Sequence, residues 1–112
     1  MTITNAIASV AVSDLSKSAK WYEQLFGRAA DATPTPELAE WNFERGGGLQ
    51  VYQLKARAGS GSVSLVISSL QSQMEDLRKL GIDPGQPLID GRTKVVMIKD
   101  LDGNSLAFVE TI

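Results

Sequence analysis

The sequence predicts an α+β fold in which one β-α-β-β-β unit occurs twice. Stretches of alternating apolar and polar residues predict the strands, and one amphipathic helix follows the first strand of each half. The two halves also match by position: Val12-Ser13-Asp14-Leu15 recurs 55 residues later as Ile67-Ser68-Ser69-Leu70, and Phe26-Gly27 recurs as Leu80-Gly81. Self-similarity with the same order of elements indicates two related modules.

The 112 residues suit one domain, with module 1 at about 3–54, a linker at about 55–61 and module 2 at about 62–112. A net charge of -2 provides no basic face for nucleic acid. No apolar run reaches the ~20 residues of a membrane helix, and residues 1–5 lack a signal-peptide pattern. We therefore expect a cytoplasmic protein. The sequence contains no cysteine and no histidine, so the usual zinc ligands and the usual neutral-pH base are missing.

Module 1 is predicted to begin with a strand at residues 6–12 and a helix at 15–26. Asp14 suits the helix N-cap, because its carboxylate accepts from free N–H groups of the first turn. Gly27 suits a left-handed C-cap. The apolar stripe of this helix is wide and comprises Leu15, Ala19, Trp21, Tyr22, Leu25 and Phe26.

The rest of module 1 is predicted as short strands and turns. Thr33–Pro36 is a loop or an edge strand, since each proline removes a ladder donor. Glu40–Glu44 and Leu49–Leu54 alternate as strands do, and Arg45–Gly48 connects them. A glycine run can present N–H groups to a phosphate, but no helix follows this one, so we interpret it as a turn.

Module 2 repeats this order. It has a strand at residues 63–67, a helix at 70–80 capped by Ser68 or Ser69 and ended by Gly81, and strands at 86–89, 93–98 and 105–110. Between the last two strands lies Lys99-Asp100-Leu101-Asp102-Gly103-Asn104. Its Asp-Gly pair predicts a hairpin with a type I′ turn, since both residues tolerate positive φ.

Each module has one helix, which covers only one face of its sheet. We expect an apolar set to pack under the helices: Val10, Val12, Val63, Leu65, Ile67, Leu106 and Phe108. Twisted antiparallel sheets curve readily, so the other two faces are expected to curl toward each other into a cup. Such a cleft is a common place for a ligand.

Two segments at opposite ends carry a family resemblance. Val10–Ser18, with Trp21-Tyr22 and Leu25-Phe26-Gly27, resembles the N-terminal signature of the glyoxalase/bleomycin-resistance/extradiol-dioxygenase superfamily, the vicinal oxygen chelate fold. Lys99–Leu106 is similar to the closing Asp-Pro-Asp-Gly-Asn hairpin of that family, with Leu101 in place of proline. The resemblance implies paired βαβββ modules that form a cupped mixed sheet, usually in a homodimer.

The resemblance also implies where a metal would bind. Metal-dependent members use four His, Gln or Glu ligands, and the matching positions here are Ile7, Gln50, Ser62 and Ala107. Only Gln50 is an ordinary ligand type. One amide and one hydroxyl cannot hold a divalent cation without carboxylates. We therefore expect no metal and no cofactor.

The first functional hypothesis is a metal-independent protein that binds a small organic molecule, similar to the branch that sequesters bleomycin-type antibiotics. Aromatic rings would stack on a planar ligand, and amides and hydroxyls would orient it. The candidate ligand-binding residues are Ser9, Trp41, Phe43, Gln50, Tyr52, Ser64 and Met97. For Trp41 and Phe43 an alternative remains open, in which both are core or dimer-interface residues.

The second hypothesis is an enzyme of the same family, a lyase, isomerase or dioxygenase. A metal-dependent enzyme would need further ligands such as Glu40, Glu44 or Glu110, and a metal-independent one could use a carboxylate or Lys94. The third is an interaction module, or a dimer whose own side chains fill the cleft. Function varies widely on a shared fold, so these alternatives stay open.

Overall fold

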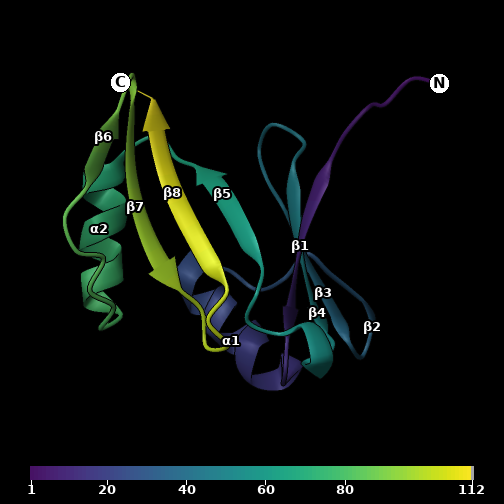
Figure 1. The fold of residues 1–112 in the computed structure, drawn as a ribbon. Coiled ribbons are helices and arrows are strands. Elements are labelled where there is room, and N and C mark those ends of the chain that lie inside the picture. The colour runs from purple at the N-terminus through teal and green to yellow at the C-terminus, as the bar shows by residue number, and fades with distance from the viewer. Residues whose placement is uncertain (112) are drawn as a thin grey trace.

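The computed structural model describes residues 1–111 and contains the predicted unit twice (Figure 1). The first unit consists of β1 (Ile7–Val12), α1 (Leu15–Phe26), β2 (Ala32–Thr35), β3 (Leu38–Asn42) and β4 (Gly48–Gln53). After a short 3-10 helix, η1 (Lys55–Arg57), the second unit consists of β5 (Ser62–Val66), α2 (Leu70–Lys79), β6 (Leu88–Asp90), β7 (Thr93–Lys99) and β8 (Ser105–Thr111). The α+β class is confirmed; Ile112, the predicted end of module 2, lies outside the described residues.

Each unit forms its own four-stranded mixed sheet. Sheet 1 has the order β1-β4-β3-β2, and sheet 2 has the equivalent order β5-β8-β7-β6. In both sheets the first strand of the unit pairs in parallel with the last one, and the remaining pairs are antiparallel. Within residues 1–111, neither helix has the length and apolar character that crossing a membrane requires.

The strand boundaries differ from the prediction around the two prolines. Residues 33–35 belong to β2, which lies at the edge of sheet 1, so Pro34 costs few ladder bonds there, and Pro36 lies in the turn that follows. β3 begins at Leu38 and ends at Asn42, two residues earlier at each end than predicted. The strand ends there because the Phe43 N–H donates to the Gly47 carbonyl (2.8 Å) and the Gly46 N–H donates to the Phe43 carbonyl (3.0 Å), which closes a turn.

The helix caps follow the sequence prediction. The Asp14 carboxylate accepts from the Lys17 N–H (3.2 Å), and Gly27 ends α1 with a φ of 73°. Ser69 is the N-cap of α2, and its hydroxyl accepts from the Ser72 N–H (3.3 Å). Side-chain acceptors at these positions satisfy helix N–H groups that have no partner within the helix.

A second cap in each unit comes from its last strand. Gln53, at the end of β4, accepts from the Leu15 N–H through Oε1 (2.9 Å). Glu110, near the end of β8, accepts from the Leu70 N–H in the same way (2.8 Å). The last strand of each unit therefore fixes where its helix starts. Glu110 serves this cap and does not belong to the open face of its sheet.

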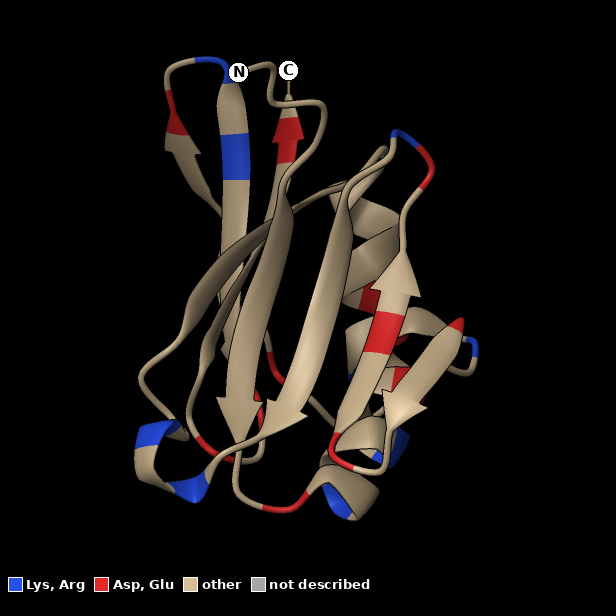
Figure 2. Cartoon of the chain, turned by 90° about the vertical axis from the view of Figure 1, so that its right-hand side faces the viewer, with Lys and Arg blue, Asp and Glu red and all other residues tan. Residues whose placement is uncertain are grey.

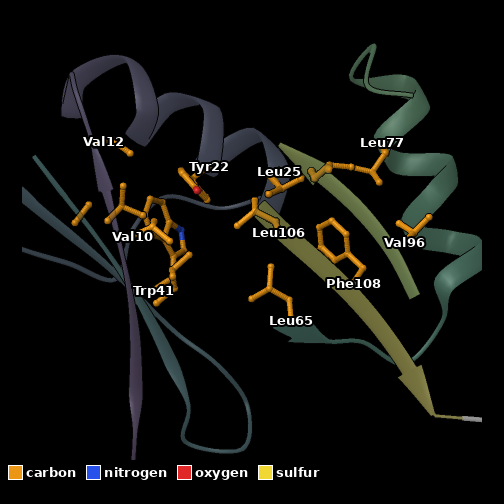
Figure 3. Packing of buried hydrophobic residues seen from close by; sticks show 14 of the residues in the cluster. Val10, Val12, Tyr22, Leu25, Trp41, Leu65, Leu77, Val96, Leu106 and Phe108 are labelled. Carbon is orange, nitrogen blue, oxygen red and sulfur yellow. The ribbon is translucent and has the colours of Figure 1, made fainter. Parts of the chain in front are cut away.

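One hydrophobic core serves both units (Figure 3). Side chains from sheet 1 and α1, such as Val10 and Tyr22, continue without interruption into side chains from sheet 2, such as Leu106 and Phe108. All seven apolar residues expected under the helices belong to this core or pack against it: Val10, Val12, Val63, Leu65, Ile67, Leu106 and Phe108. The units thus pack with their helix-covered sides toward each other.

The faces that the helices leave open point away from this shared core. In Figure 1 the open face of sheet 2 is turned toward the viewer, with α2 behind it, and sheet 1 is seen edge-on. After a quarter turn, Figure 2 shows the open face of sheet 1, with both helices behind it. The expectation that the two open faces of one chain curl into a common cup is therefore wrong. Side chains of α1 such as Leu25 share one hydrophobic core with Leu106 of sheet 2, and this core holds the covered faces together instead.

The loop between β7 and β8 joins the two units. The buried Asp100 carboxylate accepts from the Tyr22 hydroxyl of α1 (2.7 Å) and from the Asn104 side-chain amide (2.8 Å). That amide also donates to the Ala11 carbonyl in β1 (2.8 Å), and its oxygen accepts from the Gly61 N–H before β5 (2.7 Å). We call these residues the junction network. Burial and the neighbouring Asp100 carboxylate raise the pKa of Tyr22 far above its usual range, so Tyr22 remains a donor.

The turn in this loop is not the predicted type I′. Within residues 1–111 no residue other than glycine has a positive φ, so Asp102 does not adopt the conformation that type I′ requires. Instead, Leu101, Asp102 and Gly103 form a three-residue loop, with Gly103 at a φ of 96°. The cause is Asp100, whose carboxylate accepts from the N–H groups of Asp102 and Asn104 (both 2.9 Å) and holds the chain in this form.

Candidate functional site

Three polar side chains form a hydrogen-bonded chain across the open face of sheet 1. Ser9, Gln50 and Glu40 come from β1, β4 and β3, and the strand register places them side by side. The Ser9 hydroxyl donates to Gln50 Oε1 (3.2 Å), and Gln50 Nε2 donates to Glu40 Oε1 (2.8 Å). We call these three residues the polar row. Because both ends of the Gln50 amide are engaged, the row has a fixed direction that runs from hydroxyl to carboxylate.

Tyr52 lies on the same face, one step along β4 from the polar row. Its register partners are Ala11 on β1 and Leu38 on β3, so an aromatic ring with small and apolar neighbours borders the polar row. Tyr52 is half-buried. The face therefore combines an aromatic surface with fixed polar groups, which is the usual make-up of a site for a small organic molecule.

The open face of sheet 2 has a different character. Ser64, Ala107 and Met97 form its middle row, and they occupy the positions that Ser9, Gln50 and Glu40 have in sheet 1. The next row is apolar throughout and consists of Val66, Val109, Val95 and Leu88. At the opposite end the Lys99 ammonium donates to the Ser105 hydroxyl (2.6 Å). An exposed apolar sheet face of this kind often marks a binding or assembly surface.

Trp41 and Phe43 lie on the opposite side of sheet 1, although we expected them among the ligand-binding residues. Trp41 is 1% exposed, its indole N–H donates to the Arg28 carbonyl (3.1 Å), and its ring centre lies 5.5 Å from that of Phe26. The Phe43 ring packs edge-on against the same Phe26 (5.6 Å). Trp41 is a core residue and Phe43 is a partly buried residue packed against the core, which is the alternative that the sequence left open. A ligand on the open face cannot touch Trp41.

The structure therefore brings three of the seven candidate residues together, namely Ser9, Gln50 and Tyr52 on sheet 1. Ser64 and Met97 share the open face of sheet 2. Glu40 completes the polar row, although the sequence suggested it only as a metal ligand. The pairing of β3 with β4 would have placed Glu40 correctly. Trp41 pairs with the apolar Leu49, so both side chains point into the core. Glu40, one residue earlier, must then lie on the opposite face beside Gln50.

The four positions that the resemblance implies for a metal do not suit one. Ile7 and Ala107 carry no donor atom, and the Gln50 amide is held by Ser9 and Glu40. Of the other carboxylates considered, Glu110 caps α2 and Glu44 lies in the turn after β3. Within residues 1–111 no three Asp, Glu, His or Cys side chains are grouped so that they could hold a metal ion.

Two surface grooves lie away from the polar row. The larger, about 460 Å³, lies between α1 and β2 and is lined by Leu15, Ser16, Ala19, Thr33, Pro34, Thr35, Pro36 and Ala39. The smaller, about 270 Å³, lies at the end of α2 beside Arg78 and Ile82. Neither contains a residue predicted to bind a ligand.

Comparison with solved structures finds close matches over the whole chain. A glyoxalase/bleomycin resistance protein from Catenulispora acidiphila DSM 44928 matches with a TM-score of 0.86 and 26% identity, over 96% of this chain and 98% of that one. TnmS3, an antibiotic binding protein from Streptomyces sp. CB03234, matches with a TM-score of 0.83 and 19% identity, over 100% and 99%. The oxidase ChaP-H2 matches with a TM-score of 0.80 and 15% identity, over 100% and 96%. No protein-family model and no curated protein sequence matches the chain.

Proposed function

The chain belongs to the glyoxalase/bleomycin resistance/dioxygenase superfamily, and we propose that within it this protein is a metal-independent binder of a small organic molecule. The observation that carries the proposal is the polar row beside Tyr52 on the open face of sheet 1. Its groups are held in place by one another, so they can orient a ligand without reorganising. Tyr52 offers a ring face for stacking. The structural match to an antibiotic binding protein supports the same class of function.

Metal independence is supported by the side chains at the four positions of the family's metal site. Two of them are hydrocarbon, and Ser62 and Gln50 together provide one hydroxyl and one amide. A divalent cation needs several oxygen ligands with negative charge among them to compete with water. The carboxylate nearest to Gln50, that of Glu40, is already hydrogen-bonded to the Gln50 amide.

We further propose that the cleft forms between two copies of the chain. The open face of sheet 1 in one copy would lie against the open face of sheet 2 in the other, and a two-fold axis would produce two such clefts. The support is that the two open faces of one chain diverge, while Val66, Leu88 and Met97 leave apolar surface uncovered on sheet 2. In this assembly the polar open face of sheet 1 lies opposite the apolar open face of sheet 2. The ligand would therefore contact both kinds of surface.

Planar aromatic compounds are expected to stabilise the protein after treatment with EDTA. A ligand present at about 100 times its Kd contributes ~2.7 kcal/mol to the free energy of unfolding, which raises Tm by roughly 10 °C in a domain of this size. A thermal-shift screen of such compounds measures this directly. The proposal is contradicted if no compound raises Tm after EDTA, or if compounds do so only after nickel, zinc, manganese or iron is added back.

Met97→Glu is expected to separate the dimer into monomers and to abolish binding of the compounds found in that screen. The substitution places a charge in the middle of the open face of sheet 2, where the second copy would bury it without a partner. Sedimentation velocity measures the change from twice the 12.0 kDa chain mass to once that mass. The matched control is Leu101→Glu, because Leu101 is similarly exposed (59% against 53% for Met97) but lies in the loop between β7 and β8. A wild-type protein that sediments as a monomer contradicts the two-copy cleft.

A further inference from the structure

We infer that the ligand carries a positively charged group, such as a protonated amine, and that Glu40 is the residue that selects for it. This inference rests on the proposed function and concerns the same face of sheet 1. Among the four strands of sheet 1, all within the described part of the chain, Glu40 is the only charged residue (Figure 2).

The charge of Glu40 is not balanced within its own chain. Across residues 1–111 the structure contains one ion pair, between Arg28 and Asp31 (2.6 Å), and it does not involve Glu40. The partner of Glu40 is the neutral amide of Gln50, which occupies Oε1. The second carboxylate oxygen, Oε2, is therefore left for another donor, and Glu40 is already half-buried in the free chain.

A ligand that covers this face would remove water from that carboxylate. An ionised carboxylate that loses water is stable only if hydrogen-bond donors or a cation replace the water. A neutral apolar ligand, or an anion, would leave the charge uncompensated. A protonated amine or a similar cation supplies both a positive charge and N–H donors, and charge-assisted hydrogen bonds of this kind are the strong ones.

The other two residues of the polar row, Ser9 and Gln50, support this role of Glu40. The Ser9 hydroxyl donates to Gln50, and Gln50 donates to Glu40, so both donors are directed along the row toward the carboxylate. This arrangement holds Glu40 in one orientation, and it leaves a second Gln50 N–H and the Ser9 lone pairs for other polar atoms of the ligand. Module 2 has no equivalent, since Met97 stands at the position of Glu40. We therefore expect the cationic group of the ligand at the open face of sheet 1 and its apolar part at the open face of sheet 2 in the other copy.

The test uses two probes that share one ring system, 1-naphthylmethylamine as the cation and 1-naphthoate as the anion. Titration calorimetry on the wild-type protein is expected to give at least tenfold tighter binding for the amine. In Glu40→Gln, which keeps the shape and the Gln50 contact but removes the charge, amine binding is expected to weaken about ten- to a hundredfold, so that the preference disappears. The control is Glu37→Gln, which removes the same charge from the exposed turn between β2 and β3 and should leave the preference intact.

The other outcomes separate this inference from the proposed function. If both probes bind equally, if naphthoate binds more tightly, or if Glu40→Gln keeps the preference, the charge assignment is wrong while the binding function stands. If neither probe binds and the screen of planar compounds is also empty, both are wrong. If Glu40→Gln dissociates the dimer in sedimentation velocity, the partner of Glu40 is the second copy and not the ligand, which also overturns the inference.

Discussion

Asp100→Ala is expected to lower the free energy of unfolding by about 3–5 kcal/mol, because each buried donor that loses its acceptor costs about 1–3 kcal/mol. The Asp100 carboxylate accepts four hydrogen bonds, from the Tyr22 hydroxyl, the Asn104 amide and the N–H groups of Asp102 and Asn104. Alanine leaves all four donors without this acceptor, and those of Tyr22 and Asn104 are buried. Urea denaturation followed by circular dichroism measures the loss.

The matched control for this prediction is Asp102→Ala in the same loop. The Asp102 carboxylate accepts from the Ser13 N–H (3.2 Å) and hydroxyl (2.6 Å), but at an exposed position where water replaces the lost contacts. We therefore expect Asp102→Ala to lower the free energy of unfolding by only about 1 kcal/mol. Tyr22→Phe removes one donor from the junction network and should fall between the two. Equal losses for Asp100→Ala and Asp102→Ala would show that the buried network contributes no more than the exposed contact does.

Gly59→Ala is expected to lower the free energy of unfolding by about 3 kcal/mol or more, for two separate reasons. Gly59 has a φ of 93°, which L-residues with a side chain rarely adopt. An added Cβ would also come closer than 3.0 Å to the backbone oxygen of Asp102, so the linker and the hairpin that it contacts must move apart. Thermal unfolding should show a decrease in Tm of more than 10 °C.

Gly27→Ala separates these two causes. Gly27 also has a positive φ, 73°, but nothing lies within 4 Å of its added Cβ. Its cost is the conformational strain alone, about 1–2 kcal/mol. The difference between the two variants measures the close approach of the linker to the hairpin. If both substitutions cost the same, the contact between Gly59 and Asp102 is not tight in solution.

Local patterns in the sequence were sufficient to predict the elements, because the signals for them are local. Asp14, Ser69 and Gly27 determine helix ends through bonds and φ values within a few residues. Alternation likewise predicted which side of β4 carries Gln50 and Tyr52. Strand ends were less accurate near Phe43, where a turn hydrogen bond rather than residue type ends β3.

The orientation of the two sheets relative to each other was not predicted. It depends on which parts of the chain pack against the apolar stripe of α1. The sequence did contain a signal for it. The apolar stripe of α1, widened by Trp21 and Leu25, is broader than one sheet can cover, so part of it must contact something else. In the structure, Leu25 belongs to the core that also contains Leu106 of sheet 2. The contact between Asp100 and Tyr22 was missed for a similar reason: turn statistics describe the neighbours of Asp100 in sequence, and Tyr22 is far away in the chain.

The junction network has a consequence for the rate at which this protein reaches its folded state. Its hydrogen bonds join Tyr22 to Asp100 across 78 positions and Ala11 to Asn104 across 93. Pairings at such separation form late, because the entropy of closing a long loop must be overcome before the contact contributes. Until the loop between β7 and β8 reaches α1, each unit exposes the half of the core that the other one covers, and the chain is most prone to aggregation during that interval.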